Sequence, residues 1–217
     1  MLNILKEKNP QLPLYSVDSP EFATYGRIDT ALDAEELLAL AATLEKPAEG
    51  AMYRPSLPEF EALPAGRAIQ ERFFGTLPAQ IGYCWGENSY LNATEWHFCN
   101  EVNIAVTPLV LLLGHVWDVR DGKIDASQFK AFYVPQGTVL EVYATTLHFT
   151  PCQVQPEGFG CVVALARGTN TDLTAPTEAP LLFRKNKWLL AHQDNQALLQ
   201  KGIKPGITGP NLCVKYE

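Results

Sequence analysis

The feature that most constrains the fold is a series of short apolar runs between residues 79 and 166. Each run is rich in β-branched, aromatic or leucine residues, and turn signals of glycine, proline, asparagine and aspartate separate one run from the next. The runs are QIGYCWG, EVNIAV, LVLLLGHVWDV, FKAFYV, TVLEVY, LHFTPCQV and GCVVALA. Short strands at such close spacing predict a mainly β fold, either a sandwich or a barrel.

The segments on either side of these runs have a different pattern. Residues 33–46, DAEELLALAATLEK, predict an amphipathic helix with Asp33 as N-cap and Glu36 three residues later. A second helical piece, SLPEFEALPAGRAIQERFFG, is expected to break near Pro64–Gly66. The tail NKWLLAHQDNQALLQKG is part strand and part short helix. We therefore predict a single domain over residues 1–217, with a helical N-terminal elaboration (1–78), a barrel core (79–170) and a C-terminal strand and helix extension (171–217).

Charge and cysteine content exclude several classes of partner. The formal net charge is −7, and no block of basic residues interrupts the sequence, which argues against nucleic acid or an anionic membrane surface as a partner. The apolar runs are too short to span a bilayer, and MLNILKEKNP lacks the long apolar segment of a signal peptide. The five cysteines are scattered without CxxC spacing. We expect reduced thiols and a cytoplasmic location.

The stretch TEWHFCNEVNIAV (94–106) carries the clearest chemical signal. Glu95, His97 and Glu101 have the same parity, so in a continuous strand all three side chains would share one face. The residues that follow are strongly apolar, and burying an isolated charge costs several kcal/mol or more unless a partner compensates it. A bound cation would remove that cost, so this stretch predicts a metal site.

Two motifs in the chain resemble those of the cupin superfamily, whose small jelly-roll barrels bind a divalent metal. Glu95, His97 and Glu101 follow the ligand spacing of the first cupin motif, G-x5-H-x-H-x3,4-E-x6-G, with Glu95 in place of the first histidine. The second motif, G-x5-P-x-G-x2-H-x3-N, begins at Gly137 and reaches His148 at the expected spacing. Tyr143 and Thr145 replace its proline and glycine, and Cys152 replaces its asparagine. The resemblance implies a cupin-type jelly-roll barrel with Glu95, His97, Glu101 and His148 as metal ligands.

This donor set has its own chemical preference, and each residue also has a structural alternative. Imidazole and carboxylate together suit Mn, Zn, Fe, Co or Ni and usually leave positions open for substrate. His97 and His148 are alternatively buried core histidines, and Glu101 a residue at the start of a strand. Glu95 is a ligand, a catalytic carboxylate or a solvated residue. Glu141, in TVLEVY, is either a proton shuttle beside the metal or a solvated strand residue.

Two further likenesses concern the reaction. EFATYG (21–26) and KAFYVPQGTVLEVYATTLHFTPC (130–152) resemble the ureidoglycolate lyase branch of cupins. The pattern H-x3-E-V-N-x-A-V, followed later by T-T-L-H, is similar to a bacterial family in which we place a sulfoquinovose isomerase. The leading hypothesis is a metal-dependent aldose–ketose isomerase, with Glu141 or Glu95 moving the proton between C-1 and C-2 of a sugar. The alternatives are a lyase that cleaves a C–N bond of a ureido acid and a non-catalytic cupin that binds a small ligand.

An isomerase acting on a 6-sulfo or 6-phospho sugar needs a residue to hold the anionic group. The basic candidates are Lys187, Lys185 and Arg167. His192 and Trp188 are further candidates for contact with the substrate, Trp188 by stacking on a sugar face. We expect a small-molecule substrate and a homodimer.

Replacement of Cys99 by serine tests the assignment of ligands. Cys99 shares the parity of His97, but a free buried cysteine is usually a packing residue. We expect Cys99→Ser to leave the metal content nearly unchanged, as measured by elemental analysis of the purified protein. A loss as large as that caused by His97→Ala would show that a ligand had been misassigned.

Overall fold

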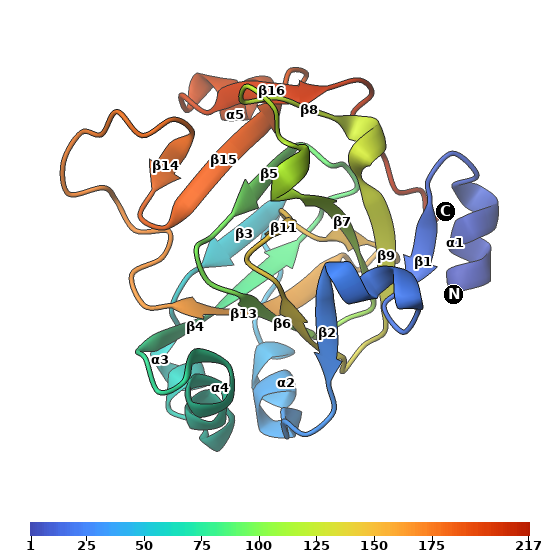
Figure 1. The fold of residues 1–217 in the computed structure, drawn as a ribbon. Coiled ribbons are helices and arrows are strands. Elements are labelled where there is room, and N and C mark those ends of the chain that lie inside the picture. The colour runs from blue at the N-terminus through green and yellow to red at the C-terminus, as the bar shows by residue number, and fades with distance from the viewer.

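The computed structural model describes residues 1–217, and its β-strands form two layers (Figure 1). An apolar interior lies between these layers. One layer is a six-stranded sheet in the order β2-β10-β6-β13-β4-β3. Its neighbouring strands are antiparallel throughout. The strands are β2 (Gly26–Asp29), β3 (Ala51–Arg54), β4 (Ala79–Gly86), β6 (Glu101–Ala105), β10 (Val139–Val142) and β13 (Phe159–Ala166).

The second layer is built from two smaller sheets. In one the order is β1-β9-β7-β11, with β12 also paired to β7, and in the other it is β14-β15-β16-β8, with β5 paired to β15. An isolated bridge between Glu95 and His148 links the two sheets edge to edge. The strands are β1 (Leu14–Ser16), β5 (Ala93–Trp96), β7 (Leu109–His115), β8 (Ile124–Asp125), β9 (Lys130–Val134), β11 (Thr146–Leu147), β12 (Cys152–Gln153), β14 (Leu182–Arg184), β15 (Lys187–His192) and β16 (Lys204–Thr208).

Alternation along the strands divides the buried apolar residues among three large clusters and a small fourth one of Ala93, Leu189, Ala191 and Ile203. The interior cluster joins Cys161 and Val163 of the six-stranded sheet to Leu111 and Phe132 of the opposite layer. A second cluster lies on the outer face of the six-stranded sheet, under the helices. A third covers the outer face of the other layer, where α1 and the C-terminal segment pack. This sandwich confirms the predicted mainly β, jelly-roll fold.

Helices cover one face of the six-stranded sheet, and α2, α3 and α4 lie together below it in Figure 1. The interhelical break falls immediately before Pro64, close to the predicted position, because proline favours the first turn of a helix and not its interior. The helices are α1 (Leu2–Lys8), α2 (Glu35–Ala41), α3 (Pro58–Glu61), α4 (Pro64–Phe74) and α5 (Gln196–Gln200), with short 3-10 turns at Pro20–Thr24, Val116–Asp118 and Ala126–Gln128.

Two local predictions differ from the structure. Residues 1–78 are not only helical, because β1, β2 and β3 from this segment join the sheets. The helix predicted over 33–46 is the shorter α2; Asp33 accepts a hydrogen bond from the backbone N–H of Glu35 but is not the N-cap. The chain beyond Ala41 enters a turn and a proline-containing loop before β3. None of the helices is both apolar enough and long enough to cross a bilayer.

Removal of a buried aromatic ring under the helices is expected to destabilise the fold. Phe60 is 0% exposed and makes an edge-on contact with Tyr83 at 6.0 Å between ring centroids. Truncation of a buried phenylalanine costs about 3–5 kcal/mol because it leaves a cavity. We expect Phe60→Ala to lower the free energy of unfolding by about this amount in urea titrations. Leu77→Ala is the control, because the side chain of Leu77 is 67% exposed. This change should alter the free energy of unfolding by less than about 0.5 kcal/mol. Equal losses in both variants would contradict this description of the core.

Candidate metal centre

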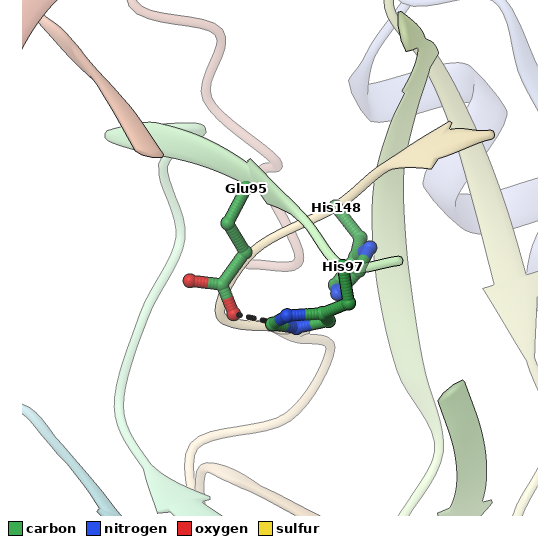
Figure 2. Close-up of side chains that lie close together, drawn as sticks. All are labelled: Glu95, His97 and His148. Atoms are coloured by element: carbon green, nitrogen blue, oxygen red, sulfur yellow. Dashed lines mark ion pairs between the residues drawn. The ribbon is translucent and has the colours of Figure 1, made fainter. Parts of the chain in front are cut away.

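Three neighbouring segments bring four ionisable side chains together at one end of the interior. Glu95 lies on β5, His97 follows that strand, Glu101 begins β6 and His148 follows β11. The backbones of Glu95 and His148 are joined directly, with N–H to O=C distances of 2.7 and 3.0 Å in the two directions. Figure 2 shows the side chains of Glu95, His97 and His148 pointing toward one another.

The four side chains are buried and their donor atoms are close. The ligand atoms of Glu95, His97 and His148 all lie within 4.8 Å of one another. An oxygen of Glu101 lies 3.3 Å from Nε2 of His148 and 3.6 Å from Nε2 of His97. Nε2 of His97 lies 3.7 Å from Oε1 of Glu95. These distances place two imidazoles and two carboxylates around one point.

Backbone carbonyl groups fix the orientation of both imidazole rings. Nδ1 of His97 lies 2.5 Å from the carbonyl oxygen of Asn186, and Nδ1 of His148 lies 3.0 Å from that of Thr146. A carbonyl oxygen only accepts hydrogen bonds, so each Nδ1 carries a proton. In the neutral rings Nε2 therefore carries a lone pair, and both Nε2 atoms are buried without a hydrogen-bond partner. Hydrogen bonds of this kind, made by the ring nitrogen that does not bind the ion, orient metal-bound histidines.

Burial and charge act in opposite directions on the pKa values of this cluster. Burial alone would lower the pKa of His148, but the carboxylate of Glu101 outweighs it and raises that pKa to about 9. Burial would likewise raise the pKa of Glu101, yet His148 and His97 hold it well below its usual range. Glu101 therefore stays anionic at neutral pH. Without a metal, the cluster holds a proton on His148 to balance this charge.

Each carboxylate has a second polar neighbour. Oε1 of Glu101 accepts a hydrogen bond of 2.8 Å from the side-chain amide of Asn103. Glu95 forms an ion pair with Lys187, whose side chain is only 14% exposed. Glu95 thus lies between an imidazole and an ammonium group, whereas Glu101 lies between the two imidazoles.

The cluster opens into a cavity of about 150 Å³ between the two layers. Glu95, Glu101 and His148 supply its charged wall, and Lys187 is the only lysine or arginine in its lining. The remaining lining residues include both polar and apolar side chains, namely Tyr53, Cys84, Asn103, Phe149, Thr150, Pro151, Cys161, Val163 and Asn170. The volume and the mixed lining suit a small polar ligand.

The structure places Glu141 away from this cavity. In the sheet Glu141 pairs with Val102, and paired residues point to the same face, here the outer one under the helices. Its carboxylate lies 2.5 Å from Nε of Arg27 and accepts a 2.8 Å hydrogen bond from the amide of Asn100. Both oxygens are thus engaged by partners outside the cavity. The geometry does not support the predicted proton-shuttle role of Glu141.

Of the predicted substrate-binding residues, only Lys187 lines the cavity. Arg167 pairs with Glu61 at 2.8 Å and donates to the carbonyl of Ala79, while the side chain of Lys185 is exposed. His192 is fully buried, with Nε2 lying 3.0 Å from the carbonyl oxygen of Gly209. Trp188 stacks on Trp96 at 6.2 Å between ring centroids.

The sequence interpretation missed four polar residues of the site. Asn186, at the tip of the β14–β15 hairpin, holds the ring of His97 through its carbonyl group and the backbone of Phe98 through its side chain. Asn103 supports Glu101, and Tyr53 and Asn170 line the cavity. The available signals were weak: a turn-forming asparagine between Lys185 and Lys187, and a polar residue within the strand EVNIAV.

Comparison with known proteins identifies the family. The fold and the site define a jelly-roll protein with a candidate metal centre inside the barrel. The chain belongs to the family described as "Domain of unknown function (DUF4867)", whose model matches residues 14–212. None of the curated proteins matches the sequence.

Several solved structures are similar in part. An oxalate decarboxylase has a TM-score of 0.36 at 11% identity, over 58% of this chain and 28% of that one. Oxalate decarboxylase from Bacillus subtilis, in work on its Mn(II) centres, has a TM-score of 0.33 at 11% identity, and the match covers 56% of this chain and 28% of that one. A variant of salicylate 1,2-dioxygenase from Pseudoaminobacter salicylatoxidans, in complex with gentisate, has a TM-score of 0.31 at 9% identity, over 63% and 30%. The matched part is less than a third of each neighbour, and TM-scores below 0.5 say nothing about the reaction of this protein.

The residues present fit a divalent metal ion. Two buried Nε2 lone pairs without a partner and two buried carboxylates form a donor set typical of Mn, Zn, Fe, Co or Ni sites. His97, His148 and Glu101 would hold the ion, and Glu95 is close enough to be a fourth ligand.

Loss of either imidazole is expected to abolish metal binding. We expect the purified protein to contain about one divalent metal per chain, and His97→Ala or His148→Ala to reduce this value to near zero. His115→Ala is the matched control, because His115 stacks between Tyr25 and Trp117 and is not part of the cluster. Elemental analysis after dialysis against Mn, Co or Zn measures the content. Full occupancy in both site variants would disprove the metal centre.

Binding of the metal should release a proton. In the folded, metal-free protein the pKa of His148 is raised to about 9, whereas in the unfolded chain a histidine has a pKa of about 6.5. Protonation of His148 therefore stabilises the folded protein fully below about pH 6.5, and this stabilisation is lost as the pH rises through about 9. At about pH 7.5 the metal must therefore displace about one proton, and its affinity should fall as pH decreases. Calorimetric titrations in buffers of different ionisation enthalpy measure the number released. A value of zero would show that His148 is already neutral.

Proposed function

We propose that this protein is a metal-dependent aldose–ketose isomerase that acts on a sugar or on a sugar with an anionic 6-substituent. The observation that supports it most is the position of Glu95, a buried carboxylate at the edge of the metal cluster that also lines the cavity. Isomerisation of an aldose needs a group that removes a proton from C-2 and returns it to C-1. We assign that transfer to Glu95.

The two carboxylates differ in the groups that surround them. Glu101 lies between two imidazoles, and its pKa is held well below the usual range, so it is a good ligand and a poor base at neutral pH. Glu95 approaches only one of the imidazoles and is paired with Lys187 on its other side. We therefore assign His97, His148 and Glu101 as ligands and Glu95 as the acid–base residue.

The reaction would proceed through a cis-enediol. A divalent ion, when bound, supplies Lewis acidity that polarises the carbonyl group of the sugar. Glu95 takes the C-2 proton and returns it to C-1, while a proton moves from O-2 to O-1, so atoms and charge balance.

Lys187 supports a substrate with a negative charge. It is the only lysine or arginine that lines the cavity, and an ammonium group there would pair with a sulfonate or phosphate. The conversion of sulfoquinovose to sulfofructose is the specific reaction that we propose to test first. Of the two stretches that resemble ureidoglycolate lyases, EFATYG supplies no residue to the cavity, whereas residues 130–152 supply His148 and its three successors Phe149, Thr150 and Pro151. The lyase therefore remains the alternative function.

A screen of the metal-loaded protein against aldoses tests this proposal. The panel contains hexoses and pentoses, 6-phospho sugars and sulfoquinovose, with the ketose measured as product. In D₂O, an enediol route should incorporate deuterium at the carbon that receives the proton. No ketose from any sugar in the panel would disprove the isomerase and leave a binding protein or another enzyme.

The role of Glu95 is tested by Glu95→Gln, which keeps the size and removes the titratable group. We expect kcat to fall by roughly two to four orders of magnitude, the usual worth of general acid–base catalysis, with little change in metal content. Glu141→Gln makes the same chemical change outside the cavity and should leave kcat within a few-fold. Loss of metal in Glu95→Gln would instead make Glu95 a ligand. A large loss of kcat in Glu141→Gln, but not in Glu95→Gln, would identify Glu141 as the acid–base residue.

A further inference from the structure

A pair of polar side chains lines the cavity apart from the metal cluster. Tyr53 lies on β3, in register with Cys84 of β4, and its ring packs against the interior cluster. Asn170 lies in the turn after β13. Both residues line the cavity, and neither is one of the candidate metal ligands.

The backbone around Asn170 holds its side chain in place. Asn170 has a φ of 68°, a left-handed conformation that asparagine tolerates better than most residues. Its N–H donates to the carbonyl of Lys185 at 3.0 Å, which ties this turn to the β14–β15 hairpin. Its Oδ1 atom is buried without a hydrogen-bond partner. A buried acceptor left without a donor costs about 1–3 kcal/mol, so a donor from a bound ligand would relieve that cost.

The hydroxyl group of Tyr53 offers the complementary donor. Nδ2 of Asn170 donates to this hydroxyl over a long contact of 3.5 Å, so the tyrosine proton is free for another acceptor. Burial, together with the nearby Glu101 and Glu95, raises the pKa of Tyr53. The group therefore stays protonated and acts as a donor at all physiological pH values.

We propose that Tyr53 and Asn170 form a subsite that binds one hydroxyl group of a polyhydroxylated substrate. A hydroxyl oxygen accepts from Tyr53 while its hydrogen is donated to Oδ1 of Asn170, so a single neutral group satisfies both residues. An anionic oxygen has no hydrogen to donate to Asn170, and it would lie near the negative charge of Glu101. The inference rests on the proposed function only in that the substrate is a polyol. It adds a contact that selects among sugars by the hydroxyl they present.

Xylitol is a suitable probe because it carries five hydroxyl groups and no carbonyl group to isomerise. Its affinity for the metal-loaded full chain is measured by calorimetry for wild type, Tyr53→Phe and Asn170→Gly. Glycine adopts a positive φ without strain, so the second variant removes the side chain alone. Each change should weaken xylitol binding about tenfold, the usual worth of a buried hydrogen bond. The double variant should lose less xylitol affinity than the product of the two single fold-losses, because both side chains contact one hydroxyl group.

A matched control and two further measurements separate binding from folding. Tyr83→Phe removes a hydroxyl from the outer face of the neighbouring strand β4 and should bind xylitol as wild type does. Metal content should be unchanged in all variants, and a cooperative thermal transition should show that each variant is folded. Wild-type affinity in both subsite variants, fully additive losses, or no xylitol binding at all would overturn the subsite. Because xylitol binding requires no turnover, a failed aldose screen would leave this test intact and would count against the isomerase alone.

Discussion

Compensation of buried charge at the ends of β5, β6 and β11 is the constraint on which the rest of the site depends. Glu101 is buried beside two imidazoles, and an anion in such a place persists only with a positive partner. A proton on His148 supplies that partner in the metal-free chain, and a divalent ion would supply it more completely. The carbonyl groups of Thr146 and Asn186 hold both rings so that their Nε2 atoms face this charge.

The C-terminal segment is part of the site and not an appendage to the barrel. β15 pairs with β5 and completes the layer that carries Glu95. The tip of the same hairpin provides Asn186, which holds His97, and Lys187, which pairs with Glu95. The turn at Asn170 is joined to this tip by a backbone hydrogen bond, and Thr169 accepts a further bond from the side chain of Asn186. A displacement of the hairpin would therefore move a ligand, a candidate base and the cavity wall together.

The alternation of side chains assigns different roles to carboxylates that look alike in sequence. Glu101 and Glu141 lie on neighbouring antiparallel strands, and both are buried. Glu101 is opposite Val142 and faces the interior, whereas Glu141 is opposite Val102 and faces the helices. A shift of one residue in register would exchange these faces. Glu141 instead meets Arg27 of β2 and is left outside the cavity.

The sequence by itself determined the fold class and the segments from which the site is built. Period-two patterns and turn signals place the strands of the barrel, because side-chain alternation and turn chemistry are local properties. Ligand spacing selected Glu95, His97, Glu101 and His148, and the structure brings these residues together. The predicted reason for their convergence, a shared face of one continuous strand, differs from the structure, however. TEWHFCNEVNIAV is not one strand but two, and β5 and β6 pair within different layers. Only the tertiary structure decided that the turn at 97–100 carries the chain from one layer to the other and that Glu141 faces away from the cavity. It also selected Lys187 from the three basic candidates and added Tyr53, Asn170 and Asn186 to the site. Those contacts join residues far apart in the chain, and no local pattern encodes which distant strand a segment will pair with.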